Sequence, residues 1–194
     1  MIFTINGIGD SAAGTTDKLA AFLKTQHDLD VVPLRYKPVS WRTARDRTRM
    51  YETAGQMIRV MTTYDGPHHI VGHSWGCGLT AAILNHAPDG FVESCTLFNA
   101  ALDRDWVFPL SPERFDRITN VWNPCDFALF LGKMLGRWHP FGGLGSEGHH
   151  PKRPDDRITD IEMRFSNTKH SHNPFSDPDL LWTAAQIVKE TIRA

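Results

Sequence analysis

Residues 72–76 read Gly-His-Ser-Trp-Gly, so Ser74 has a glycine two positions away on each side. A short apolar run ends at Gly72, and residues 79–84 form a second apolar run with helical character. This pattern predicts a nucleophile elbow, a sharp strand-to-helix turn that holds the serine in a strained backbone conformation with its hydroxyl exposed. Side chains at the flanking glycines would collide with the strand and helix, and Gly78 extends the pattern into the first helical turn.

A serine hydroxyl is a weak nucleophile at neutral pH and needs a base within hydrogen-bond reach. In a doubly wound sheet, the base and the carboxylate that orients it come from loops at the carboxyl ends of later strands. Asp126 follows the apolar run 117–122, and His170 follows the apolar run 158–165. In chain order, Ser74, Asp126 and His170 are therefore the candidates for a nucleophile, an orienting acid and a base.

The elements that must position these residues alternate between short apolar runs and helical patterns. Apolar residues at helical spacing predict helices near 19–23, over 44–61, from the elbow to about 86, and from Asp177-Pro178 onward. The alternation predicts an α/β fold, with a doubly wound, mainly parallel six-stranded sheet covered by helices on both faces, in a single domain over residues 1–194. The expected strands are residues 2–6, 30–34, 69–72, 93–99, 117–122 and 158–165.

Two stretches interrupt this alternation. Residues 100–116 connect the fourth and fifth expected strands with little room for a helix. Residues 136–156 are rich in Gly, Pro and His, and we expect no regular element there. A loop of that length is usually functional or mobile, and we expect it to form a rim of the site.

The charge balance excludes several classes of partner. With 21 basic and 22 acidic residues, no global field favours nucleic acid or an anionic membrane. The basic run at 42–49 is interrupted by Asp46 and followed by Glu52, so we interpret it as a solvated face. No apolar run approaches the ~20 residues that cross a bilayer. The N-terminus lacks the pattern of a signal peptide, and we expect a cytoplasmic protein.

Neither the ten histidines nor the three cysteines show the spacing of a metal site. We therefore expect no metal. Cys77, Cys95 and Cys125 are odd in number and lack a CxxC pair, which is typical of free thiols in a reducing compartment.

The chain resembles the α/β-hydrolase superfamily, in its serine esterase and lipase branch. The resemblance covers nearly the whole chain and rests on residues 72–76, the acid loop 123–126, the histidine loop 166–172 and Asn6-Gly7-Ile8-Gly9 after the first expected strand. It implies a minimal version of the fold without a large lid domain, and a strand order of 2-1-3-4-5-6.

The resemblance also implies a serine hydrolase that cleaves a carboxylic ester through a Ser-His-Asp triad and an acyl-enzyme intermediate. The backbone amides of Ile8 and Trp75 would form the oxyanion hole, and no cofactor is needed. Asn6 stands where such enzymes often carry histidine, which leaves the backbone donor intact.

Each partner of Ser74 has a competitor. His172 lies two residues after His170, but the family usually has a small residue directly after its histidine, and Ser171 fits. We therefore choose His170 and interpret His172 as a solvated loop residue. Asp103 follows the fourth expected strand, where some hydrolases carry the acid, and we interpret it as a cap.

The expected substrate is a small-molecule ester with a short-to-medium acyl chain, because residues 100–116 are too few for a multi-helix cap. A thioesterase or an acyltransferase would use the same triad. A non-enzymatic ligand-binding protein of this fold is the alternative from another class. Such a protein has no need of an ordered triad beside an oxyanion loop, so these features favour the enzyme.

Overall fold

The structure is a computed structural model that describes residues 1–8, 14–37, 43–102, 108, 112–135, 144–149, 155–165 and 172–193. Its strands form one six-stranded sheet, parallel throughout, in the order β2-β1-β3-β4-β5-β6. This confirms the expected fold class and strand order. The strands are β1 (Ile2–Ile5), β2 (Val31–Leu34), β3 (His68–His73), β4 (Val92–Phe98), β5 (Arg117–Trp122) and β6 (Ile158–Glu162).

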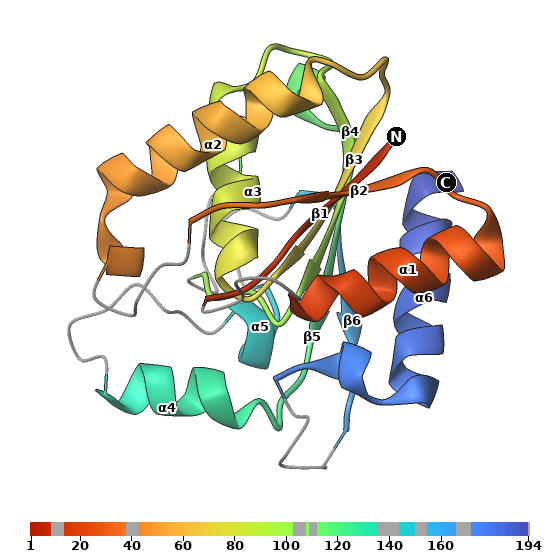
Figure 1. The fold of residues 1–194 in the computed structure, drawn as a ribbon. Helices are drawn as coiled ribbons and strands as arrows, with labels where there is room; N and C mark the ends of the chain where they lie inside the picture. The colour runs from red at the N-terminus through yellow and green to blue at the C-terminus, as the bar shows by residue number, and fades with distance from the viewer. Residues whose placement is uncertain are drawn as a thin grey trace.

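The helices are arranged in two layers around the sheet. Those described are α1 (Thr15–His27), α2 (Arg47–Met61), α3 (Trp75–His86), α4 (Phe127–Leu135), α5 (Leu144–Glu147) and α6 (Pro178–Arg193), with short 3-10 turns at Thr43–Arg45, Pro112–Arg114 and Pro174–Ser176. Figure 1 shows α2 and α3 on one face and α1 and α6 on the other, while α4 and α5 lie at the end where the strands finish. Among the described helices, none combines the length and the hydropathy that a membrane crossing requires.

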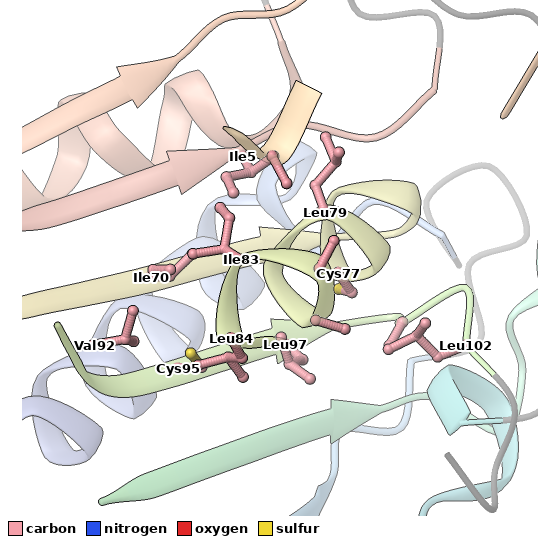
Figure 2. Close-up of a cluster of buried hydrophobic side chains, with 14 of the residues drawn as sticks. Ile5, Ile70, Cys77, Leu79, Ile83, Leu84, Val92, Cys95, Leu97 and Leu102 are labelled. Atoms are coloured by element: carbon pink, nitrogen blue, oxygen red, sulfur yellow. The ribbon is translucent and has the colours of Figure 1, made fainter. Parts of the chain in front are cut away.

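The central strands are apolar on both faces because helices cover both. Along β3, Ile70 belongs to the core beneath α2 and α3, and its neighbour Val71 belongs to the core beneath α1 and α6. Leu97 and Phe98 alternate in the same way on β4. Figure 2 shows side chains of α3, such as Ile83, packed against those of the sheet. Strands buried on both faces carry the continuous apolar runs from which they were predicted.

The helices at the carboxyl end of the sheet were not predicted. α4 begins directly after Asp126, and α5 lies within the stretch expected to hold no regular element, so that expectation is wrong for residues 144–147. This short helix is held by tertiary contacts that the local sequence does not reveal. The amides of Leu144 and Gly145 donate to the carbonyls of Leu102 and Ala100, each at 3.0 Å. The expected rim residues 136–143 and 150–154 lie outside the described residues.

Buried histidines on β3 make stability depend on pH. Burial, with a smaller effect of the positive N-terminus, lowers the pKa of His69 from 6.5 to about 4, and its Nδ1 lies 2.8 Å from the hydroxyl of Ser94. Between these two pKa values the unfolded chain binds a proton that the folded chain rejects. The free energy of unfolding should therefore fall as the pH drops from about 6.5 towards 4, by up to about 1.4 kcal/mol per pH unit for this group.

We expect the substitution His69→Gln to reduce the loss of stability over that interval, because glutamine does not titrate. Urea unfolding measured at pH 8, 6.5, 5.5 and 4.5 provides the comparison. The difference in the free energy of unfolding between the two proteins at pH 8, where His69 is neutral in both states, serves as the reference for the lower pH values. Parallel curves for the two proteins down to pH 4.5 would show that His69 is not held neutral by the fold.

Candidate active site

The turn between β3 and α3 has the strained geometry expected of an elbow. Ser74 is its central residue and adopts φ 54° and ψ −121°, a conformation that residues with a side chain rarely occupy. A Cβ atom at Gly76 would lie 2.4 Å from the carbonyl oxygen of Ile5, and one at Gly72 would lie 2.8 Å from Oγ1 of Thr80. Gly76 is therefore required by close backbone approach, and Gly72 by the buried side chain of Thr80 together with the backbone of Cys77 at 3.1 Å, so both flanking positions are crowded as predicted.

Gly78 differs from these two glycines. A Cβ atom there would meet only the sulfur of Met50, at 3.6 Å, which is an ordinary van der Waals contact. The expectation that Gly78 extends the steric constraint is not supported: among residues 72, 76 and 78, only the two glycines that flank the serine are enclosed tightly.

The structure brings a hydroxyl, an imidazole and a carboxylate into one hydrogen-bonded line. Oγ of Ser74 lies 2.8 Å from Nε2 of His172, and Nδ1 of His172 lies 2.8 Å from Oδ2 of Asp126. The carboxylate of Asp126 is fully buried, whereas the imidazole of His172 is 27% exposed. A partly exposed imidazole between a hydroxyl and a buried carboxylate is the arrangement that activates a serine for nucleophilic attack.

The interpretation of His172 as a solvated loop histidine is wrong, because both of its ring nitrogens have hydrogen-bond partners in the site. His170 lies outside the described residues. The sequence did contain a signal that favours His172, because Asn173-Pro174 directly after it is typical of the start of a turn. In the structure, the side chain of Asn173 accepts a hydrogen bond from the amide of Phe175 and starts the turn Pro174–Ser176. His172 directly precedes Asn173, so this anchored turn also limits the position of His172.

Asp126 is fixed by three donors. Its Oδ2 also accepts a hydrogen bond from the side-chain amide of Asn99 at 2.7 Å, and its Oδ1 accepts one from the backbone amide of Leu129 at 3.0 Å. The carboxylate therefore caps α4, where the helix dipole favours negative charge. Asn99 is a site residue that the sequence analysis missed. It follows β4 directly, with φ 48°, a conformation that asparagine tolerates better than most residues. Asp103 lies outside the described residues.

The segment after β1 passes directly beside the nucleophile. A Cβ atom at Gly7 would lie 3.0 Å from Cβ of Ser74, so Ile8 follows at the edge of the site. The hydroxyl of Tyr36 bonds to the carbonyl of Asn6 at 2.9 Å, and the side-chain oxygen of Asn6 accepts a hydrogen bond from the amide of Thr16 at 2.7 Å. Asn6 thus anchors this segment to the start of α1, a role that its comparison with histidine did not predict.

Trp75 is the first residue of α3, and the first amides of a helix have no acceptor within the helix. Its indole nitrogen donates to the carbonyl of Ala44 at 3.0 Å, which fixes the orientation of the side chain. Both segments adjoin Ser74: Ile8 follows Gly7, which lies against the serine, and Trp75 is the next residue in the chain.

The three cysteines take no part in this hydrogen-bonded line. Cys77 and Cys95 are buried, and burial raises the pKa of both thiols, which keeps them protonated and unreactive. Cys125 is exposed beside Asp126. Over the described ranges, no three His, Cys, Asp or Glu side chains gather in a way that could hold a metal ion.

No protein-family model matches the chain, and no curated protein matches its sequence. Its fold is nevertheless similar to several solved structures. α/β-Hydrolase domain-containing protein 10 from mouse is 10% identical, with a TM-score of 0.62 over 98% of this chain and 88% of that one. The monoacylglycerol lipase of Paleococcus ferrophilus is 12% identical, with a TM-score of 0.61 over 98% and 93%.

A pyrethroid hydrolase from Sphingobium faniae is 13% identical, with a TM-score of 0.51 over 100% of this chain and 98% of that one. These likenesses confirm the resemblance on which the sequence analysis relied: the chain has the α/β-hydrolase fold, in a form of 194 residues. The neighbours are named as hydrolases or a lipase, and at these identities the likeness shows the fold alone.

The two glycines of α3 provide a matched test of the elbow. We expect Gly76→Ala to destabilise the protein by several kcal/mol and to disrupt the turn, because its Cβ would collide with the carbonyl of Ile5. Gly78→Ala should instead stabilise it by about 0.5–1 kcal/mol through helix propensity. Urea denaturation of both variants checks this. Equal effects of the two substitutions would contradict the assignment of the steric constraint to Gly76.

Proposed function

We propose that the protein is a serine hydrolase that cleaves a carboxylic ester through an acyl-enzyme intermediate. The observation that carries this proposal is the hydrogen-bonded line from Ser74 through His172 to Asp126, with 2.8 Å at each step, built on a strained elbow. A strained, glycine-flanked serine is costly to fold, and such strain is typically found at functional sites. A ligand-binding protein of this fold would have no need of it.

The geometry supports the following steps. Nε2 of His172 accepts the proton of Ser74 as the serine oxygen attacks the ester carbonyl. Asp126 holds the imidazole with Nδ1 protonated and stabilises the imidazolium that forms. His172 then gives its proton to the leaving alcohol, and the acyl group remains on the serine. A water molecule then gives a proton to His172 and attacks the acyl-enzyme. As the bond to Oγ breaks and the acid leaves, His172 returns that proton to Ser74.

The amides of Ile8 and Trp75 are the proposed donors to the oxyanion. The position of Gly7 against Ser74 supports the first, and the helix start at Trp75 supports the second. Each such donor typically lowers the barrier by about 3 kcal/mol.

An apolar surface next to the acid supports an apolar substrate. α4 begins directly after Asp126, and three of its large apolar side chains are exposed: Phe127 by 53%, Phe130 by 53% and Leu131 by 37%. The rings of Phe127 and Phe130 are stacked, with centroids 6.4 Å apart. Exposed apolar side chains that gather at one place usually mark a binding surface. We therefore propose that this face of α4 receives the acyl chain or the alcohol group of the ester.

The triad leads to a direct kinetic prediction. Ser74→Ala and His172→Ala should each lower kcat on a p-nitrophenyl ester by several orders of magnitude, because the two residues act as a unit, and the double variant should be no slower. Asp126→Asn should lower kcat by about four orders of magnitude, since an amide favours the wrong imidazole tautomer.

His170→Ala is the matched control for the base. It should retain activity, because the structure gives both imidazole contacts to His172. If His170→Ala proves inactive while His172→Ala works, the base is His170, as the sequence alone suggested, and the triad proposed here is wrong.

The proposed substrates are soluble esters of short-to-medium chain length, because no helical cap is described between β4 and β5 in residues 100–102, 108 and 112–116. The variant Phe130→Ser should raise KM for p-nitrophenyl octanoate about tenfold but leave the acetate nearly unchanged, by loss of apolar contact. Trp182→Ser, which removes a comparably exposed aromatic from α6, is the control and should change neither. An equal loss with both esters would show that α4 does not contact the acyl chain.

A further inference from the structure

His73 is the last residue of β3 and directly precedes the nucleophile, yet the steps above assign it no role. Its side chain is buried, with 1% of the residue exposed. Both ring nitrogens have partners: Nε2 lies 2.6 Å from the backbone carbonyl of His172, and Nδ1 lies 2.9 Å from the hydroxyl of Thr15. A buried imidazole joins the strand before the elbow to the residue that acts on the serine.

The partners determine the protonation state of this ring. A carbonyl oxygen can only accept a hydrogen bond, so Nε2 of His73 carries a proton and donates it to His172. Burial, and to a smaller extent the charge of His172, lowers the pKa of His73 to about 3, so the ring is neutral near neutral pH. Nδ1 is then unprotonated and accepts a hydrogen bond from Thr15.

Packing limits the orientation of the His73 ring. The edge-to-face contact with Phe175 has a centroid separation of 5.5 Å, and Phe175 in turn packs against Phe98 at 5.2 Å. Thr15 belongs to the first turn of α1. The ring is therefore held by α1 and by the turn that follows His172, which itself packs against β4, and it has little freedom to move away from the carbonyl.

We propose that His73 is a positioning residue that holds the backbone of His172, and with it the imidazole, within hydrogen-bond reach of Ser74. This inference rests on the proposed function. The side chain of Asn173 fixes the chain after His172, and the bond from His73 fixes His172 itself. Catalytic geometry must hold to within about 0.5 Å, and a displacement of about 1 Å can reduce the rate about 100-fold.

A neutral donor suits this place better than a charged one. The ring centroids of His73 and His172 are 5.0 Å apart. A positive charge at His73 would oppose the imidazolium that forms on His172 during acyl transfer, because like charges at this separation disfavour each other. The neutral imidazole donates its hydrogen bond without that repulsion.

Two substitutions separate positioning from packing. The side-chain amide nitrogen of glutamine can reach the place of Nε2 and donate to His172, whereas leucine fills similar space without a donor. We expect His73→Leu to lower kcat on p-nitrophenyl acetate about 10- to 100-fold with little change in KM, and His73→Gln to recover most of that loss. If the side chain only fills space, leucine should be at least as active as glutamine.

His69 provides the matched control, because it is another buried histidine of β3 with a hydroxyl partner, at the opposite end of the strand. His69→Leu and His69→Gln should alter stability but not kcat. If His73→Leu and His73→Gln have equal kcat, or if the His69 variants lose kcat to the same extent, the positioning role is overturned.

A spectroscopic measurement on the wild-type protein tests the inference without any variant. Nitrogen NMR of histidine-labelled protein at pH 7.5 should show a ring at His73 with a proton on Nε2 and none on Nδ1. A proton on Nδ1 alone would overturn the role of His73 and leave the proposed function intact. A folded wild-type protein that turns over no ester would overturn the proposed function and this inference together.

Discussion

The backbone conformation of Ser74 is the constraint on which the site depends. Strain of this kind typically costs on the order of 1–3 kcal/mol and persists only where the surroundings enforce it. On one side lie the end of β1 and the residue after it: a Cβ atom at Gly76 would come within 2.4 Å of the carbonyl oxygen of Ile5 and 2.6 Å of that of Asn6. On the other side lies α3, which is buried from Trp75 to Leu84. Burial of that helix between α2 and the sheet offsets the strain, so the serine lies between a buried strand and a buried helix.

Each group around the serine is tied down by a different element. Asp126 is held by Asn99, which directly follows β4, and by the first turn of α4, and His172 is held by His73 from β3 and by the turn that follows it. The segment beside the proposed oxyanion position is anchored by Asn6 to α1. Because these ties come from neighbouring strands of one parallel sheet, their ends meet at one edge, and the order of the strands determines which groups can meet.

The fold was predictable because its signals are local and repeated. Alternating apolar runs and helical patterns predicted all six strands, and Gly72 and Gly76 marked the turn. The proposed base was harder to predict, because His170 and His172 are two residues apart in one loop and, apart from the turn that starts at Asn173, the features that single out His172 are its tertiary contacts with His73 and Asp126. α4 was missed because nearly all of residues 127–135 are apolar, which leaves no polar face to reveal a helical period.

The most direct test of the account is the site of covalent modification by a fluorophosphonate. The attacking serine oxygen would bond to phosphorus and displace fluoride, so the folded protein should gain the mass of one phosphonyl group. Peptide mass spectrometry should place this group on Ser74. Modification of another residue, or no modification of folded protein by excess reagent, would contradict the claim that Ser74 is an activated nucleophile.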